Sequence, residues 1–276
     1  MRDTPFVMVL RWVCLILALV VMLFPIYWML NTALKPSSEI FQYPPTFWSA
    51  NWSLDAFWTV LTERPIGRYF LNSLIVATGT TVLSLCIASL AAYGLTRFPI
   101  RIEALIILSL LFIKMLPEAL LVVPFFQLIA GAGLLNNYIA LILVYSSFAL
   151  PFAVWMLVGF FRAIPRELDE AGIMDGASRI GTFALVVLPL AKPGLVAVAM
   201  VTFLTAWNAY LWSLVLTTAP SMYVLPVGIA TLKGEYQVNW NELMAAAVIA
   251  VVPVLAIYSI LERHLVAGIT AGAVKG

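Results

Sequence analysis

A short polar segment between two long apolar stretches carries the densest group of chemically active side chains. Three acidic residues, Glu167, Asp169 and Glu170, follow Pro165 within a few positions. Proline suits the first turn of a helix because its missing N–H has no partner there. Acidic side chains in that turn interact favourably with the helix dipole. We therefore predict a surface helix over about 165–176, too short and too charged to cross a membrane.

Small residues on this helix indicate a docking surface rather than a catalytic site. Ala171 and Gly172 follow Glu170, and Asp175-Gly176 can end the helix because glycine accepts a left-handed backbone. Small side chains would let the groove of another protein approach the backbone closely. The alternative interpretation is an ordinary connector that happens to be helical.

Two charged residues lie inside an otherwise apolar stretch. Lys114 and Glu118 are four positions apart, so on one helix they could pair along the same face. Charged groups within a membrane span are costly and usually face a cavity or a partner. Pro117 and Pro124 should loosen the helix locally. The pair either lines a substrate pathway or neutralises itself at a kink.

Four further residues are compatible with a sugar. Hydroxyl groups need amide partners, and sugar faces stack on aromatic rings. The candidates are Asn72, Trp207, Asn208 and Tyr210. Each could equally hold one helix to another.

The composition requires a lipid environment. Of 276 residues, 63% are hydrophobic and 10% are charged, whereas a soluble surface needs about 25% charged residues. The net charge of +2 and the lack of a basic run argue against nucleic acid. Cys14 and Cys86 lie in apolar stretches and are expected to be inert. His264 is the only histidine, so we expect neither an enzyme nor a metal site.

Six apolar stretches approach the roughly 20 residues that a membrane-spanning helix needs. We predict an all-α polytopic membrane protein with a single transmembrane domain over residues 1–276, because no stretch alternates like a barrel strand. The predicted spans are approximately 7–31, 69–96, 103–130, 138–161, 183–211 and 243–263.

Lysines and arginines set the orientation, since positive residues stay on the cytoplasmic side. With the N-terminus in the cytoplasm, ten fall inside and four outside, so we expect both termini to be cytoplasmic. The four outside are Lys35, Arg64, Arg68 and Lys233. We expect tryptophans 48, 52, 58, 212 and 240 at the outer membrane boundary, as interfacial aromatics.

The 170–189 region resembles the EAA signature of binding-protein-dependent ABC importer permeases. Glu170-Ala171-Gly172, three residues, Gly176, nine residues, Val186, one residue and Leu188-Pro189 match its spacing. Gly172 and Val186 depart from its alanine and isoleucine. The resemblance runs from about Asn72 to Gly276 and is closest to the MalG-type carbohydrate branch, although Ala209 replaces an acidic residue that is frequent there.

This resemblance implies a type I importer permease fold (MetI-like) and a role for Glu170–Gly176 as the coupling helix that docks on an ATPase. It implies two ABC ATPase subunits that bind ATP and Mg, a second permease of MalG or MalF type, and an extracytoplasmic sugar-binding protein. The chain itself has no Gly-Lys dipeptide, hence no phosphate-binding P-loop, and we expect no cofactor in it. Lys275 and Gly276 resemble the family tail at the ATPase interface; the alternative is a frayed terminus.

We therefore expect a subunit that imports a di- or oligosaccharide by alternating access in the bacterial or archaeal cytoplasmic membrane. Glycerol-phosphate compounds or polyols are the alternative substrates. An ion-coupled secondary transporter fits less well, because that class uses relays of intramembrane carboxylates and internal repeats. Among the predicted spans, only Glu118 offers such a carboxylate deep in the apolar region.

Overall fold

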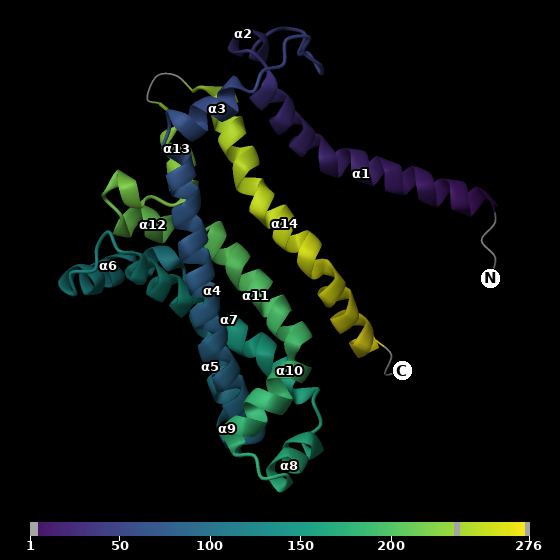
Figure 1. Cartoon of the computed structure of the whole chain (residues 1–276), viewed down its shortest axis with the longest axis vertical. Coiled ribbons are helices and arrows are strands. Elements are labelled where there is room, and N and C mark those ends of the chain that lie inside the picture. The colour runs from purple at the N-terminus through teal and green to yellow at the C-terminus, as the bar shows by residue number, and fades with distance from the viewer. Residues whose placement is uncertain (1–4, 235–237, 274–276) are drawn as a thin grey trace. The chain divides into compact units, whose positions relative to one another are not determined.

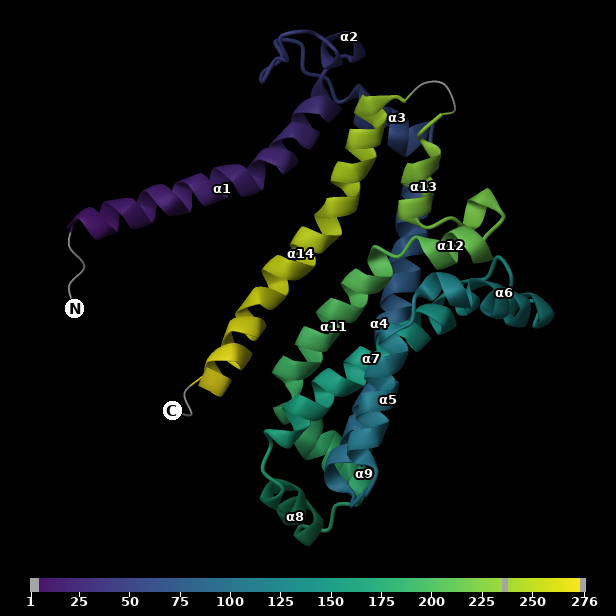
Figure 2. The same cartoon turned by 180° about the vertical axis from the view of Figure 1, so that it is seen from behind.

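The computed structural model describes residues 5–234 and 238–273, and these form helices joined by turns (Figures 1 and 2). The described residues also include an isolated antiparallel β-bridge between Lys233 and Val238. The predicted all-α fold is confirmed. Two compact units divide the chain: one takes in the residues up to Gly67 with Gly228–Pro253, the other takes in Arg68–Val227 and the residues after Pro253.

The first unit contains long apolar helices and the segment between them. Its helices are α1 (Pro5–Leu34), α2 (Ser37–Ile40), α3 (Asp55–Thr62) and the first part of α14 (Trp240–Ala273). Arg64 pairs with Glu242 at 3.0 Å, and the Asn241 amide donates to the Lys35 carbonyl at 3.2 Å. These contacts tie the segment after α1 to the start of α14. None of the most apolar window of α1 is buried within the chain, as expected for a helix in lipid.

The second unit is larger and carries every candidate site residue within the described ranges. Its helices are α4 (Ile66–Arg97), α5 (Glu103–Met115), η1 (Glu118–Leu121), α6 (Val122–Gly131), α7 (Tyr138–Arg162), α8 (Glu167–Met174), α9 (Arg179–Thr182), η2 (Phe183–Val187), α10 (Leu188–Leu190), α11 (Lys192–Trp207), α12 (Leu211–Leu216) and η3 (Pro220–Met222). Helix α13 (Leu225–Thr231) leads into the first unit.

Helix α7 is the centre of this unit. It packs against α5, α11 and α12, and 61% of its most apolar window is buried. Two apolar clusters lie along it. One gathers Ala92, Leu157, Phe161 and Val187 near the α8 end, and the other gathers Tyr145, Phe148 and Trp212 near α12. A helix that is apolar all round and mostly buried is the element around which the others pack.

Four of the predicted spans correspond to single helices. The helices Phe6–Leu34, Ile66–Arg97, Tyr138–Arg162 and Trp240–Ile260 are each long and apolar enough to cross a membrane. The predicted third and fifth spans are not single helices, because each is a pair of helices bent by more than 40° at a short break. Counting each pair as one span gives up to six spans in the described residues.

The third predicted span breaks at Pro117. Helix α5 ends at Met115, Leu116 is extended (φ −69°, ψ 131°), and the chain resumes at an angle of 89°. Proline disfavours helical backbone in the residue before it and offers no N–H, so the helix cannot continue through this position. Figures 1 and 2 show α6 turned sharply away from α5.

The fifth predicted span breaks at Ala191. Helices Arg179–Leu190 and Lys192–Trp207 meet at 78°, and Ala191 has φ −80° and ψ 1° at the junction. A π-helical turn, η2, precedes the break, and prolines at 189 and 193 flank it. The second arm ends at Trp207, short of the predicted Leu211, and α12 follows as a separate short helix.

Candidate functional site: the surface helix α8 and its supports

The predicted surface helix is present as α8, Glu167–Met174, inside the expected 165–176. Gly176 has φ +88°, the left-handed conformation that glycine adopts without strain. The Gly176 N–H donates to the Ile173 carbonyl and the Ala177 N–H to the Gly172 carbonyl, both at 3.0 Å. This pair of bonds is a Schellman motif, which ends the helix by satisfying its last carbonyls. Asp175 is the C-cap residue.

Helix α8 presents an exposed face of small and apolar side chains. Glu170 and Ala171 are exposed, as are Ile173, Met174 (87%) and the nearby Ile180 (77%). Within α8 the buried residue is Asp169. The exposed apolar side chains form a surface that lacks a partner within the described chain, a pattern typical of a protein–protein contact.

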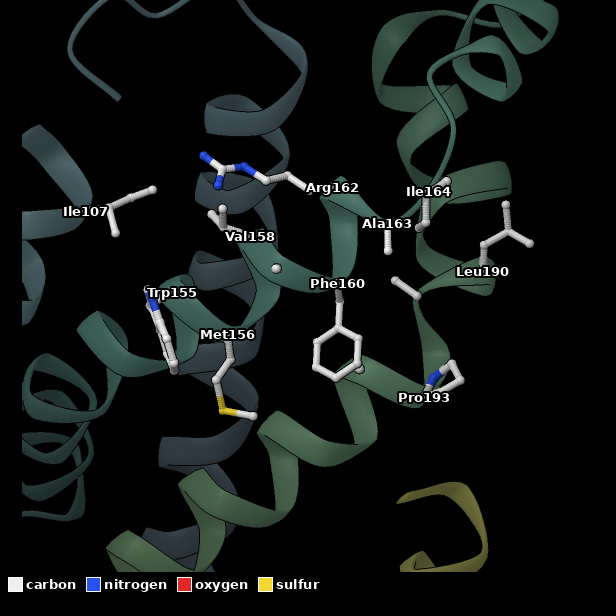
Figure 3. A pocket seen from close by; sticks show the side chains of 13 residues that line it. Ile107, Trp155, Met156, Val158, Phe160, Arg162, Ala163, Ile164, Leu190 and Pro193 are labelled. Atoms are coloured by element: carbon white, nitrogen blue, oxygen red, sulfur yellow. The ribbon is translucent and has the colours of Figure 1, made fainter. Parts of the chain in front are cut away.

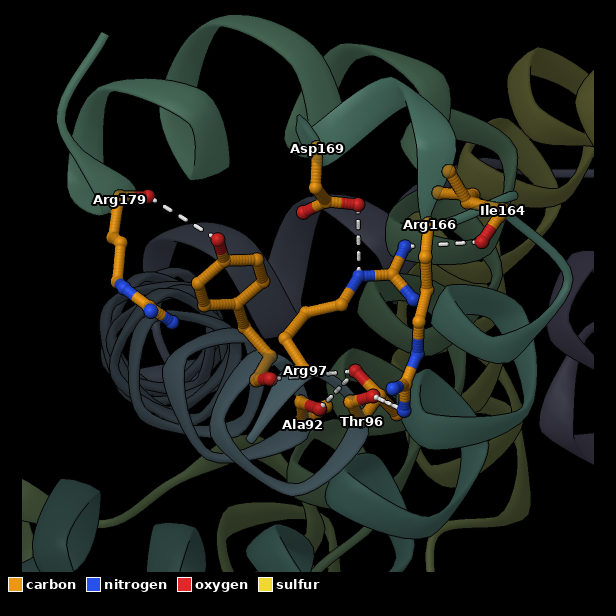
Figure 4. Close-up of polar contacts among 8 residues, drawn as sticks. Ala92, Thr96, Arg97, Ile164, Arg166, Asp169 and Arg179 are labelled. Carbon is orange, nitrogen blue, oxygen red and sulfur yellow. Dashed lines mark hydrogen bonds and ion pairs between the residues drawn. The ribbon is translucent and has the colours of Figure 1, made fainter. Parts of the chain in front are cut away.

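An ion pair and two hydrogen bonds attach α8 and the turn before it to the end of α4 (Figure 4). Arg97 Nε lies 3.0 Å from Asp169 Oδ2, with the two side chains 6% and 10% exposed. Arg97 also donates from Nη2 to the Ile164 carbonyl at 3.0 Å. From the other side, Arg166 donates to the Thr96 carbonyl at 2.6 Å.

The turn after α8 is held to the same helix. The Tyr93 hydroxyl donates to the Arg179 carbonyl at 3.2 Å, and the Arg179 guanidinium lies 5.0 Å from the Phe98 ring centroid. Sequence reasoning missed these supports. Arg97 and Arg179 entered it only as positive residues on one side of the membrane, and Asp169 only as a charge in the first turn.

Gly172, at the third position of the EAA pattern, lies against α9 and η2, which follow α8 in the chain. A Cβ on Gly172 would lie 3.2 Å from Thr182 Cγ2 and Oγ1 and 3.5 Å from Val186 Cγ2. The glycine therefore allows α8 to pack closely on α9 and η2. Leu188 packs on the apolar cluster near α8, and Pro189 is exposed in α10, immediately before the break at Ala191.

Asn72, a predicted substrate residue, is 2% exposed and fully engaged within the chain. Its amide nitrogen donates to the carbonyls of Ser221 at 3.0 Å and Tyr223 at 2.8 Å, and its oxygen accepts from the Tyr138 hydroxyl at 2.7 Å. These bonds favour the alternative interpretation, in which Asn72 holds helices and a loop together.

The predicted pairing of Lys114 with Glu118 along one helix face is wrong. The helix ends between them, so the four-residue spacing no longer places them on the same face. Lys114 instead donates to the Phe148 carbonyl at 3.2 Å, and Glu118 accepts from the Trp212 indole at 3.0 Å. The expectation of an interfacial Trp212 is also wrong, because this side chain is 1% exposed.

Trp207, Asn208 and Tyr210 lie together where α11 ends. Trp207 is buried, stacked on Phe203 with ring centroids 5.7 Å apart. Asn208 is exposed and donates to the Leu204 carbonyl at 2.9 Å, and Tyr210 is 42% exposed. Asn208 and Tyr210 therefore stay available as predicted substrate contacts. Lys275 and Gly276 lie outside the described residues.

An apolar cavity of about 800 Å³ lies among α5, α7, α10 and α11 (Figure 3). Its lining includes Trp155, Met156, Phe160, Leu190 and Pro193, with Arg162 as its charged residue. A sugar needs several amide or hydroxyl partners, so this cavity does not suit one. None of the predicted substrate residues lines it.

Comparison with known families decides the identity of the chain. The model of the family described as "binding-protein-dependent transport system inner membrane component" matches residues 6–271. The chain belongs to this family. It is therefore a permease subunit of a transport system and an inner membrane component.

Named relatives of this permease match it over nearly its whole length. It is 36% identical to the sulfoquinovosyl glycerol transport system permease of Agrobacterium fabrum, covering 97% of this chain and 94% of that protein. It is 33% identical to the trehalose/maltose transport system permease of Thermococcus litoralis, covering 100% of both chains. It is 34% identical to a diacetylchitobiose uptake permease of Streptomyces coelicolor, covering 92% of each.

Solved structures show the same fold. A chain from a bacterial ABC transporter that imports the acidic polysaccharide alginate superposes with a TM-score of 0.81 at 21% identity, covering 95% of this permease and 98% of that chain. A chain of the MetNI methionine transporter matches with a TM-score of 0.55 at 22% identity, covering 78% and 98%. The predicted type I importer permease fold is confirmed.

Proposed function

We propose that this permease is one membrane subunit of an ATP-driven importer that carries a di- or oligosaccharide across a bacterial or archaeal cytoplasmic membrane. The observation that carries the proposal is the surface of α8, where Glu170, Ala171 and Met174 are exposed beside a glycine-terminated helix end. The names of three relatives, which carry sulfoquinovosyl glycerol, trehalose or maltose, and diacetylchitobiose, support a sugar as cargo.

In this proposal α8 docks on a separate ATPase subunit. Two such subunits bind ATP and Mg, and a second permease of the same family completes the pathway. Closure of the ATPase pair presses on α8 and moves the helices between inward-open and outward-open states. A binding protein outside the membrane delivers the sugar. In this proposal both termini lie in the cytoplasm.

Docking is tested by changing the exposed face of α8. Ala171→Arg adds a long charged side chain, and Met174→Lys charges an apolar contact. We expect each variant to reduce the amount of ATPase that co-purifies with the permease in detergent by more than tenfold. The matched control is Leu54→Lys, which charges an exposed leucine (67%) in the first unit rather than in the unit that contains α8. Undiminished co-purification with both α8 variants would contradict the proposal.

Substrate class is tested on the binding protein encoded beside this permease. Titration calorimetry would compare trehalose, maltose and diacetylchitobiose with glycerol 3-phosphate and sorbitol. We expect micromolar binding of at least one of the sugars and none of the other two compounds. Binding of glycerol 3-phosphate or sorbitol alone would replace the sugar assignment by one of the alternatives.

A further inference from the structure

The attachment of α8 to the rest of the permease is unusual for a surface helix. Apolar burial normally holds such a helix in place, but the buried residue within α8 is the charged Asp169. The apolar side chains Leu168, Ile173 and Met174 are instead 41%, 45% and 87% exposed. The position of α8 on its own subunit therefore depends on the partner of Asp169 and on the close approach of Gly172 to Thr182.

That partner is the last residue of a long, unbroken helix. Arg97 ends α4, and its guanidinium contacts two points at once: Asp169 through Nε and the Ile164 carbonyl through Nη2, both at 3.0 Å. The guanidinium therefore combines an ion pair to Asp169 with a hydrogen bond to Ile164, and arginine keeps its charge in such a buried site. Because both charges are buried, removing one would leave the other without compensation.

The end of α4 is the natural place for these contacts. The last carbonyls of a helix lack partners within it and carry partial negative charge. Arg166 donates to one of them, the Thr96 carbonyl, and thereby ties the N-terminal end of α8 to α4. Tyr93, one turn earlier in α4, holds the Arg179 carbonyl beyond the other end of α8.

We propose that the Arg97–Asp169 ion pair holds α8 rigidly to α4, so that the two helices move together when the ATPase acts. This inference rests on the proposed function of α8. Arg97 and Asp169 are positioning residues in it: they contact neither nucleotide nor cargo and act by fixing the helix that does the docking.

The test measures the distance between α8 and α4 directly. Spin labels are attached to Glu167→Cys, an exposed position at the start of α8 that is not among its docking residues, and to the native, exposed Cys86 of α4, in a Cys14→Ser background of the full chain. Arg97→Met and Asp169→Asn each remove one charge of the ion pair with little change in side-chain size. In liposomes we expect the distance distribution of both variants to be at least twice as wide as that of the parent.

A matched control and a second state sharpen the experiment. Glu103→Gln removes an ion pair between α5 and Arg162 of α7 that is 57% exposed on the arginine side and includes no residue of α8, so it should leave the distribution unchanged. In the complex with the ATPase, trapping with ATP and vanadate should leave the parent distance unchanged and shift it in the variants.

Two results would contradict this proposal. One is a distance distribution in both variants that is as narrow as in the parent, and the other is a parent distance that changes on vanadate trapping. If the ATPase fails to co-purify with the parent chain, the proposed function falls, while the liposome measurement on the chain alone still decides whether Arg97 and Asp169 hold α8.

Discussion

Trp212 donates its indole N–H to the carboxylate of Glu118 over 3.0 Å, inside an aromatic cluster with Phe125 and Phe148. Trp212→Phe keeps the ring packing and removes the donor to the half-buried Glu118 carboxylate, so it should destabilise the chain by up to about 1.5–3 kcal/mol, the range for a hydrogen bond to a charged group. A lower midpoint of thermal unfolding in detergent would report it. Trp58→Phe, at a tryptophan that is 70% exposed, should leave the midpoint unchanged.

Gly194 tolerates no side chain. A Cβ there would lie 2.3 Å from Phe160 Cγ, inside the closely packed contact between α11 and α7. We expect Gly194→Ala to cost at least about 1–3 kcal/mol through overpacking and to lower the yield of folded permease on size-exclusion chromatography. Gly159→Ala is the control, since nothing lies within 4 Å of its Cβ. An unchanged yield for Gly194→Ala would show that the two helices separate easily.

Gly172 is a milder case. A Cβ at this position would lie 3.2 Å from Thr182, so Gly172→Ala gains helix propensity of about 1 kcal/mol but forces Thr182 to shift. We expect a net effect near zero for Gly172→Ala alone. The double variant Gly172→Ala/Thr182→Ala relieves the contact and should unfold at a higher temperature than Thr182→Ala alone. If adding Gly172→Ala lowers that temperature, close packing at this position is not the reason for the glycine.

Asn136 holds the turn between α6 and α7 to the segment after α12. Its side-chain oxygen accepts from the N–H groups of Thr218 at 2.7 Å and Ala219 at 2.8 Å. Asn136→Ala removes both bonds and should speed amide hydrogen exchange at residues 218 and 219 by roughly tenfold, since about 1.4 kcal/mol corresponds to a factor of ten. Asn136→Asp keeps the acceptor oxygen and should retain most of the protection. Equal exchange in both variants would contradict this role.

Much of the fold could be predicted from composition and length. The helices that match the first, second, fourth and sixth predicted spans follow from apolar runs long enough for a bilayer. Hydropathy gives the length of a span but not its direction, so the breaks at Pro117 and Ala191 were not predicted as sharp bends. At Pro117 the sequence indicated local loosening, and the structure shows a turn of 89°.

The candidate site was predicted only where it depends on neighbouring residues in the sequence. Local signals were enough to predict α8 and its end at Gly176, because a helix start and a glycine stop depend on neighbouring residues. The partners of Asp169 and Glu118 are Arg97 and Trp212, which are distant in sequence. The positive-inside rule puts Arg97 on the same side of the membrane as Asp169, but pairing depends on how helices pack, and no local pattern records that.

One consequence follows from the unbroken course of α4. Near one end of this helix the Asn72 amide donates to the carbonyls of Ser221 and Tyr223, and at the other end Arg97 forms an ion pair with Asp169. Asn72 and Arg97 are about 38 Å apart along the helix at 1.5 Å per residue. A straight helix that is held at both ends transmits a displacement of one end to the other. Under the proposed function, loop 221–223 should therefore respond to the nucleotide state of the ATPase that docks on α8, and a reporter dye placed in this loop would detect the response.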